Sequence, residues 1–429
     1  MRPAISILAP PPRVASPAGW SPLTVGKELP DDVFSWIRRQ MTLVHCKWDP
    51  QVEDVPTLAR FPLLIHPETW ADLRQRAEAL SAETIAMERA LIRRPELHPR
   101  LGLPRPLTRL FRTEARETPA ATRSMRFDFH FTSTGWRISE VNSDVPGGFS
   151  EASSLSRLFA ENATGTCVAG DPAEAWADAM VHHANVATGP VALLSAPGFM
   201  EDQQVVSYLA ERLRNRGIEC HLIQPCHLRW RDGAAFLKTT WSTAGVSAIV
   251  RFFQAEWLGR LGHRAEWQPL FVNGTTPVAN PGIALLSESK RLPLVWDDLG
   301  LDLPAWRAHL PATRNARDAP WRHDESWLIK TAYCNTGDSV AYLGRLTPRQ
   351  WSRTSLLVRL RPGNWIAQER FETLPIATPR GPMYPSLGVF TIDGNACGIY
   401  GRLSATPVID YAATDVAVLI DNADTEVDQ

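Results

Sequence analysis

Four side chains suited to a metal and phosphate site lie within one short stretch, residues 126–148. The stretch predicts a strand, a turn rich in threonine and glycine, and a second strand. Phenylalanine alternates with polar residues in the first strand, so Arg126 and Asp128 share its polar face. The second strand alternates again and, after a shift, places Glu140 and Asn142 on one face. We therefore expect a hairpin that carries all four side chains on the same side.

The predicted hairpin would bring Asp128 close to Glu140 and Asn142, because residues across paired strands lie only ~5 Å apart. Two carboxylates and an amide oxygen form a hard, oxygen-only donor set, which suits Mg²⁺ that carries a nucleotide phosphate. Arg126, on the same face as Asp128, could reach a phosphoryl oxygen of that ligand. The alternative is an exposed hairpin with ordinary polar residues on its solvent face.

Further residues suited to phosphate binding follow late in the chain. Lys330 ends a predicted strand, and a loop of small residues, 334–340, follows it and contains Gly337. Such a loop can fold over a triphosphate, and a lysine beside it can neutralise phosphate charge. An exposed hairpin is the alternative interpretation of this region. Lys290 lies after a serine-rich turn, and a predicted late hairpin carries Arg402 on its second strand.

The stretch RFDFHFTSTGWRISEVNSD resembles the magnesium-binding segment of the glutathionylspermidine synthetase family, which belongs to the ATP-grasp ligases. The family pattern is R-x-D, a short hairpin, and then E-x-N. The resemblance implies metal ligands at Asp128, Glu140 and Asn142 and a catalytic arginine at Arg126. It also implies an ATP-dependent carboxylate–amine ligase that works through an acylphosphate and releases ADP and phosphate. The implied cofactors are ATP and Mg²⁺, with two ions expected.

The resemblance extends over most of the chain. It implies that Lys290 and Lys330 hold the nucleotide and that the loop after Lys330 acts as a lid over it. Gln368 and Glu369 match the strand that holds adenine and ribose, and Arg402 matches a second catalytic arginine. The metal segment precedes both lysines in this chain, which is the circularly permuted order of the glutathionylspermidine synthetase branch.

The predicted fold class is α/β (α+β), an ATP-grasp-type fold in circularly permuted order with a Rossmann-like pre-ATP-grasp lobe. Residues 1–165 are expected to contain N-terminal helices and the Mg-binding half of the core. Residues 166–285 are expected to form the Rossmann-like lobe, and residues 286–429 the nucleotide-binding half with its lid. The β-α-β pattern that begins at residue 191 supports the lobe, but no glycine-rich fingerprint follows its first strand. A dinucleotide site is therefore not expected.

In ATP-grasp ligases a lobe of this kind binds the donor or the acceptor substrate. Glu201, Asp202, Gln203 and Arg251 lie at ends of predicted strands and could face that cleft, although helix capping and surface charge would explain them almost as well. Residues 145–148, VPGG, stand where the glutathionylspermidine enzymes carry small hydroxyl residues, so glutathione is not carried over as a substrate. The glycine pair in this loop would let backbone N–H groups approach an anion.

Several helices are expected, of which the longest is assigned to core packing. A helix over 31–44 would begin at a cap formed by Asp31 or Asp32. A longer helix carries one continuous apolar stripe from Trp70 to Leu91. A third helix is expected over 149–162, directly after the glycine pair.

Composition narrows the function classes. The net charge is −1 over 429 residues, so there is no basic excess that would indicate nucleic acid. No apolar run approaches the ~20 residues of a membrane helix, and no signal peptide is evident, so we expect a cytoplasmic protein that does not bind membranes. The six scattered cysteines suggest reduced thiols, and the Cys-His pairs near residue 220 fit no usual zinc spacing. The expected partners are a small-molecule or peptide carboxylate and an amine, and the oligomeric state is left open.

Two alternatives to the ligase stay open. One is a binding or regulatory protein that kept the fold and lost its chemistry, and the other is a phosphotransferase whose ADP release needs no amine. The amidase domain of bifunctional family members is not expected, because the chain before residue 126 is too short for it. Cys46 could be mistaken for the amidase nucleophile, but nothing indicates a paired base.

Overall fold

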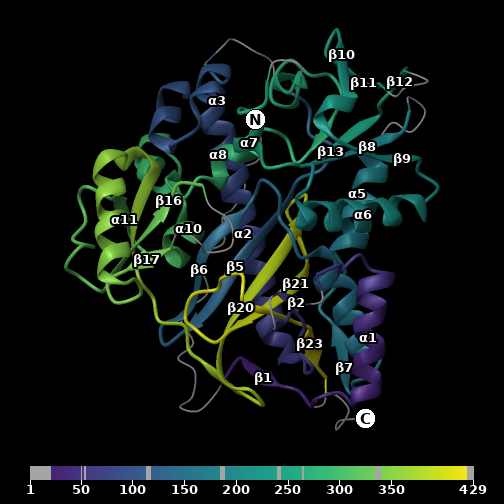
Figure 1. The fold of residues 1–429 in the computed structure, drawn as a ribbon, viewed down its shortest axis with the longest axis vertical. Coiled ribbons are helices and arrows are strands. Elements are labelled where there is room, and N and C mark those ends of the chain that lie inside the picture. Colours follow the sequence, from purple (N-terminus) through teal and green to yellow (C-terminus); the bar gives the residue numbers. More distant parts are fainter. Residues whose placement is uncertain are drawn as a thin grey trace, which may run out of the picture.

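The computed structural model describes residues 21–49, 51–52, 55–112, 117–183, 189–238, 243–262, 265–333 and 340–422. Helices pack around and between several sheets, the largest of which is antiparallel (Figure 1). The expected mixed α/β fold class is confirmed.

Two hairpins from distant parts of the chain join to form the central sheet. Its strand order is β22-β21-β20-β5-β6, and β19 pairs with β20 at one end. The strand bounds are β5 (Ser124–Thr132), β6 (Gly135–Asn142), β19 (Ile376–Thr378), β20 (Gly381–Ile392), β21 (Asn395–Ser404) and β22 (Thr414–Val416). The pairing of β5 with β20 places the predicted metal segment beside the late hairpin that carries Arg402.

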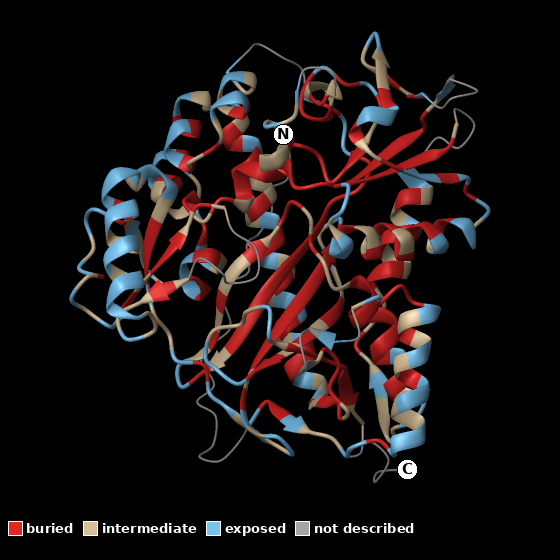
Figure 2. Ribbon diagram, viewed as in Figure 1, coloured by how far each residue is buried: buried red, intermediate tan, exposed pale blue. Residues whose placement is uncertain are grey.

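The apolar face of the central sheet is covered by the long helix α2 (Pro67–Ile92). The predicted stripe is confirmed, since Leu73, Leu80 and Met87 are completely buried together with Phe127 and Phe129 of β5. Figure 2 shows the central strands as a largely buried block. Burial of one face leaves the polar residues of β5 and β6 on the other face.

A parallel sheet forms the Rossmann-like part of the fold, with the order β14-β13-β8-β9. Its strands are β8 (Val191–Ser195), β9 (Cys220–Ile223), β13 (Ala248–Phe252) and β14 (Val278–Ala279). Helices α5 (Pro172–His183) and α6 (Met200–Arg214) pack beside it (Figure 1). A small antiparallel sheet is attached to this part and consists of β10 (Leu228–Arg231), β11 (Ala234–Lys238) and β12 (Thr243–Gly245).

A further antiparallel sheet carries the predicted nucleotide residues, with the order β15-β18-β16-β17. Its strands are β15 (Thr313–Asn315), β16 (Trp327–Thr331), β17 (Ala341–Tyr342) and β18 (Trp365–Glu369), and α11 (Pro348–Leu360) packs on it (Figure 1). The remaining sheets are formed by β1 (Leu23–Val25), β4 (Leu63–Ile65), β23 (Val418–Asp421) and β7 (Thr166–Val168), and by β2 (Gln51–Val52) with β3 (Val55–Pro56).

The remaining helices are short, apart from α1. They are α1 (Asp31–Leu43), α3 (Arg105–Leu110), α4 (Ser156–Ala160), α7 (Ala255–Leu258), α8 (Ala284–Glu288), α9 (Trp296–Leu299) and α10 (Pro304–His309).

The structure corrects the start of one expected helix and adds a detail to another. Pro30 occupies the N-cap position of α1 and no side chain caps the helix, because Asp31 and Asp32 lie inside its first turn. The helix expected over 149–162 forms without a break over 149–160 and contains a π-helical turn at Glu151–Leu155, directly before α4. Such turns are often found at functional sites.

Candidate active site

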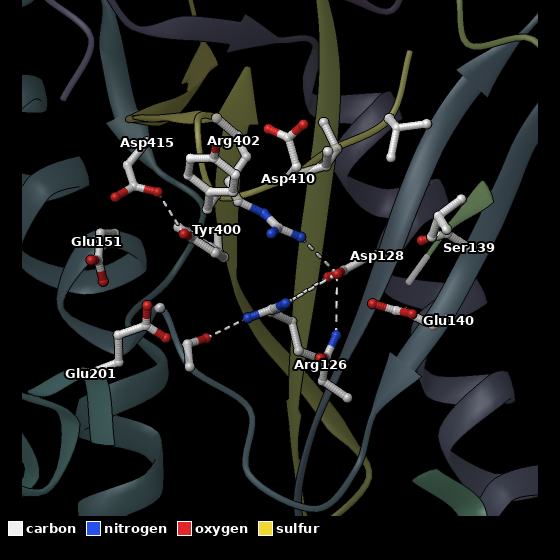
Figure 3. Close-up of a pocket in the computed structure, with 18 of the residues that line it drawn as sticks. Arg126, Asp128, Ser139, Glu140, Glu151, Glu201, Tyr400, Arg402, Asp410 and Asp415 are labelled. Carbon is white, nitrogen blue, oxygen red and sulfur yellow. Dashed lines mark hydrogen bonds and ion pairs between the residues drawn. The ribbon is translucent and has the colours of Figure 1, made fainter. Parts of the chain in front are cut away.

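A cavity of about 410 Å³ opens along the polar face of the hairpin β5–β6 (Figure 3). The parallel sheet contributes the start of α6, and the sheet that contains β16 and β18 contributes a further wall. Predicted residues that line the cavity are Arg126, Asp128, Glu140, Asn142, Lys330, Gln368, Arg402, Glu201 and Asp202. Side chains from strands that lie far apart in the sequence therefore meet in one place.

A β-bulge in the hairpin explains why these polar residues share a face. Phe127 pairs with Val141 and Phe129 pairs with Ile138, so two residues of β6 lie opposite Asp128 alone. Without the extra residue Glu140 would point to the same side as Ile138, toward the core. The bulge is the shift that the hydrophobic pattern predicted.

Asp128 is the centre of the hydrogen-bond network (Figure 3). Its Oδ1 accepts from Arg126 Nε at 2.7 Å, and its Oδ2 accepts from Arg126 Nη2 at 3.0 Å, Asn142 Nδ2 at 3.1 Å and Arg402 Nη2 at 2.9 Å. Only 1% of Asp128 is exposed. Burial alone would raise the pKa of Asp128, but the guanidinium groups of Arg126 and Arg402 outweigh it and lower this pKa to about 2. The carboxylate is therefore ionised at neutral pH.

Arg126 is held by its surroundings as well as by Asp128. Its Nη1 donates to the carbonyl of Gly147 at 2.6 Å, and its guanidinium lies 5.0 Å from the ring centre of Tyr400. A Cβ at Gly388, on the neighbouring strand β20, would lie 2.6 Å from Arg126 Cδ. Only glycine at this position leaves room for the arginine to cross the strand.

The loop at Gly147 and Gly148 does not play the expected role of presenting backbone N–H groups to an anion. The carbonyl of Gly147 holds Arg126, and a Cβ at Gly148 would lie 2.6 Å from the ring of Tyr400. Gly148 also has a φ of +92°, which L-residues with a side chain rarely adopt. The glycine pair thus packs against the arginine and the tyrosine.

The predicted nucleotide lysines lie on the Glu140 side of the cavity. Lys290 Nζ pairs with Glu140 Oε2 at 3.1 Å, and Lys330 Nζ donates to the carbonyl of Ser139 at 3.2 Å. Burial alone would raise the pKa of Glu140, but Lys290 and Lys330 lower it. A narrow adjoining pocket is lined by both lysines, Glu140 and Gln368.

The other predicted nucleotide residues are placed less uniformly. Gln368 lines the cavity and donates from Nε2 to Thr313 Oγ1 at 3.0 Å. The side chain of Glu369 is exposed and lines neither pocket, while its backbone N–H donates to the carbonyl of Ala312. Gly337 and the rest of the predicted lid, apart from Val340 at the cavity wall, lie outside the described residues.

The opposite end of the cavity is acidic, and sequence reasoning missed most of it. Lys47 Nζ pairs there with Glu151 at 2.7 Å, Asp415 at 2.8 Å and Asp49 at 3.3 Å. Figure 3 shows Glu151 and Asp415 on the far side of Tyr400 from Glu140. The scarcity of lysine in this chain was a signal for Lys47, and the alternation of β21 puts Tyr400 on the same face as Arg402. Asp415 and Glu151 had no such signal.

The start of α6 adds two carboxylates to this end, as expected for Glu201 and Asp202. Burial, together with Glu201 and Asp144, raises the pKa of Asp202 to about 8. Gln204 rather than Gln203 lines the cavity, and its Oε1 accepts from Trp48 N at 2.7 Å.

Arg251 does not face the cavity, which corrects a second expectation for this lobe. It is 1% exposed, and its Nη2 pairs with Asp144 Oδ1 at 2.5 Å in the interior. The ion pair joins the parallel sheet to the loop after β6 and therefore serves the structure.

Cys46 does not provide a second reactive centre. Cys46 is buried, and burial followed by the charge of Glu211 raises the pKa of its thiol to about 11, so it is a poor nucleophile. No group of three or more His, Cys, Asp or Glu side chains that could hold a metal ion occurs among the described residues.

The model of the glutathionylspermidine synthase preATP-grasp family matches residues 63–421 of this chain. The chain belongs to this family. In structure it is similar to a glutathione synthetase-like effector from Globodera pallida, with a TM-score of 0.63 and 16% sequence identity over 90% of this chain and 95% of that chain. At that identity the likeness shows the fold. No curated protein matches in sequence.

Membership of the glutathionylspermidine synthase family implies ATP-dependent ligase activity in general, and the family normally uses ATP and Mg²⁺. The hairpin residues fit such an ion by their chemistry, because Asp128, Glu140 and Asn142 present two carboxylates and an amide to one cavity. In this structure both carboxylates pair with cationic side chains of the protein, Asp128 with Arg126 and Arg402 and Glu140 with Lys290. No helix in the described ranges is long and apolar enough to cross a membrane.

Proposed function

We propose that this protein is an ATP-dependent carboxylate–amine ligase that forms an amide bond through an acylphosphate. The observation that carries the proposal is the order of charges along one cavity. Lysines and the hairpin carboxylates stand at one end, Arg126 and Arg402 in the middle, and further carboxylates at the other end. That order suits a nucleotide, a carboxylate and an amine, the three reactants of such a ligase.

Lys290 and Lys330 would hold the phosphates of ATP, and Gln368 would contact the nucleotide from β18. Their ammonium groups currently contact Glu140 and the carbonyl of Ser139, so they lie at the hairpin. Asp128, Glu140 and Asn142 would hold Mg²⁺, which neutralises phosphate charge when it is bound.

The two arginines would position the donor carboxylate and stabilise the transferring phosphoryl group. A carboxylate is a poor electrophile, so the oxygen of the donor first attacks the terminal phosphorus of ATP and ADP leaves. An arginine side chain is charged at any physiological pH, and Arg126 and Arg402 lie within one network around Asp128. Fixed positive charge of this kind lowers the energy of a transition state without reorganisation.

The acidic end would receive the amine. Glu201 and Asp202 line this end of the cavity, and neither forms an ion pair with a cationic side chain among the described residues. Glu201 would attract the protonated amine and accept a proton from it; the free amine then attacks the acyl carbon, and phosphate departs. The overall charge of −1 conceals this local excess of negative charge.

Binding of the nucleotide can be tested by thermal shift with Mg·ADP or a non-hydrolysable ATP analogue. The parent protein should melt at a higher temperature with the ligand, by mass action. Asn142→Ala should lose most of that shift, because it removes an oxygen ligand from the cavity. Asn395→Ala, at the exposed start of β21, is the matched control and should behave like the parent. Equal shifts in Asn142→Ala and the parent would refute the assignment of the metal ligands.

Ligase chemistry is tested by ADP release with arrays of acids and amines. Release that requires both an acid and an amine supports the ligase. Release with an acid alone that yields a stable phosphorylated product would indicate a phosphotransferase. A nucleotide shift without any turnover in the array would favour a binding protein that lost its chemistry.

A further inference from the structure

The lysine at the acidic end of the cavity is bonded in an unusual way. Only 8% of the Lys47 side chain is exposed, and its ammonium contacts three different carboxylates. An ammonium group has three N–H donors, so one donor is available for each carboxylate. Lys47 therefore has no donor left for a phosphate or a substrate carboxylate, which excludes an anion-binding role.

The groups around Lys47 form a receptor for a primary ammonium. Glu151 accepts from Ser150 Oγ as well, and Asp415 accepts from Tyr400 Oη, so both carboxylates are fixed in place. Burial alone would lower the pKa of Lys47, but Asp415, Glu151 and Asp49 outweigh it and raise this pKa well above its ordinary value. The lysine remains charged and occupies the receptor.

Carboxylates outnumber the lysine at this end of the cavity. Glu201 and Asp202 lie beside the receptor, and Asp202 Oδ2 is buried without a hydrogen-bond partner among the described residues. Only 3% of Asp202 is exposed. A buried carboxyl oxygen without a partner in a cavity wall can accept a hydrogen bond from a donor that enters the cavity, such as an ammonium group.

We propose that Lys47 is a specificity-determining residue that fills an ammonium-binding subsite with the protein's own side chain. An amine substrate then binds at Glu201 and Asp202 and cannot extend into the position that Lys47 holds. Occupancy of the subsite by Lys47 does not depend on the reaction, whereas the consequence for acceptor choice rests on the proposed ligase function.

The test removes the end of the Lys47 side chain by mutation and supplies a free amine of the same shape in solution. Lys47→Ala keeps Cβ and removes three carbons and the ammonium, which together correspond to n-propylammonium. The melting temperature of the full chain is measured against n-propylammonium chloride, with sodium chloride and tetramethylammonium chloride at equal ionic strength as controls. Lys47→Met keeps most of the side-chain volume without the charge and serves as the matched variant.

Lys47→Ala should show a saturable rise in melting temperature with n-propylammonium, at a half-saturating concentration at least about tenfold lower than in the parent. Tenfold is the size expected for even one charge-assisted hydrogen bond. Tetramethylammonium, which has no N–H donor, should give no such rise, and Lys47→Met should resemble the parent. Identical amine dependence in Lys47→Ala and either the parent or Lys47→Met would overturn the proposal.

A variant that does not fold by itself still gives an answer. Lys47→Ala is refolded from urea with and without n-propylammonium, and recovery of folded protein only with the amine supports the subsite. No recovery in either condition contradicts it, because the amine should replace the missing side chain. In the ligase assay Lys47→Ala should accept diamines that the parent rejects. If the amine binds but no ligation occurs with any acceptor, the proposed function fails and the subsite does not.

Discussion

Asp202 offers a prediction in which stability and function oppose each other. Its carboxyl is 3% exposed, and Oδ2 has no hydrogen-bond partner within the described ranges. Burial is the main cause that raises its pKa from 3.8 to about 8 in the folded protein, with Glu201, Asp144 and Glu256 adding to it. In the unfolded chain the carboxyl is exposed and has its ordinary pKa.

The direction of the pH effect follows from proton binding. Between pH 3.8 and about 8 the folded protein keeps the proton on Asp202, and the unfolded chain has released it. The folded state therefore binds more protons, so the free energy of unfolding falls as the pH rises through this window, by about 1.4 kcal/mol per pH unit. The full window would correspond to about 6 kcal/mol. Asp202 borders an open cavity, so water recovers part of this cost, and we expect about 2–4 kcal/mol.

Asp202→Asn removes the titration and keeps the shape of the side chain. Urea unfolding at pH 5, 7, 9 and 10 should show that the variant gains stability over the parent as the pH rises and that the gain levels off above about pH 8. The same variant should lose affinity for the amine acceptor, because a bound ammonium group favours the ionised form of Asp202, which an amide cannot adopt. Asp302→Asn, on an exposed loop between α9 and α10, is the control and should show no such trend. A stability difference that does not change with pH, or a variant less stable than the parent at pH 9, would refute the reasoning.

Two further substitutions test the packing that supports the site. Gly388→Ala places a Cβ 2.6 Å from Arg126 Cδ. The free energy of unfolding in urea should fall by about 1–3 kcal/mol. The nucleotide-dependent thermal shift should also be lost. Gly363→Ala, where a Cβ would meet nothing within 4 Å, should change neither, and equal behaviour of the two variants would contradict the steric argument. Asp144→Ala leaves Arg251 buried without its partner and should cost about 3–5 kcal/mol by the same measurement. A loss below about 1 kcal/mol would mean that the ion pair does not hold the two parts together.

The alternation of apolar and polar residues predicted the strands that carry the site. It predicted less well which side chains from other parts of the chain contact those strands. The hairpin, its bulge and the shared face of Asp128 and Glu140 follow from alternation alone, since side chains of a strand point to opposite sides in turn. Predictions failed at positions where the sequence allowed a side chain to point in either of two directions. Arg251 at the end of a strand could have faced the cleft, and only the proximity of Asp144 decided that it points inward.

The sequence by itself determined the residue types, the period of each element and the order of the motifs, and hence the family and the general character of the fold. It placed Asp128, Glu140 and Asn142 on one face because they lie within one hairpin. The tertiary structure alone decided that Lys47, Glu151 and Asp415 meet, because they come from a loop, a π-helical turn and a strand separated by hundreds of residues. The periodicity of the sequence does not predict contacts between such distant segments. Charge neutralisation in a buried cavity depends on distances of a few ångströms, and those distances exist only once the sheets have packed.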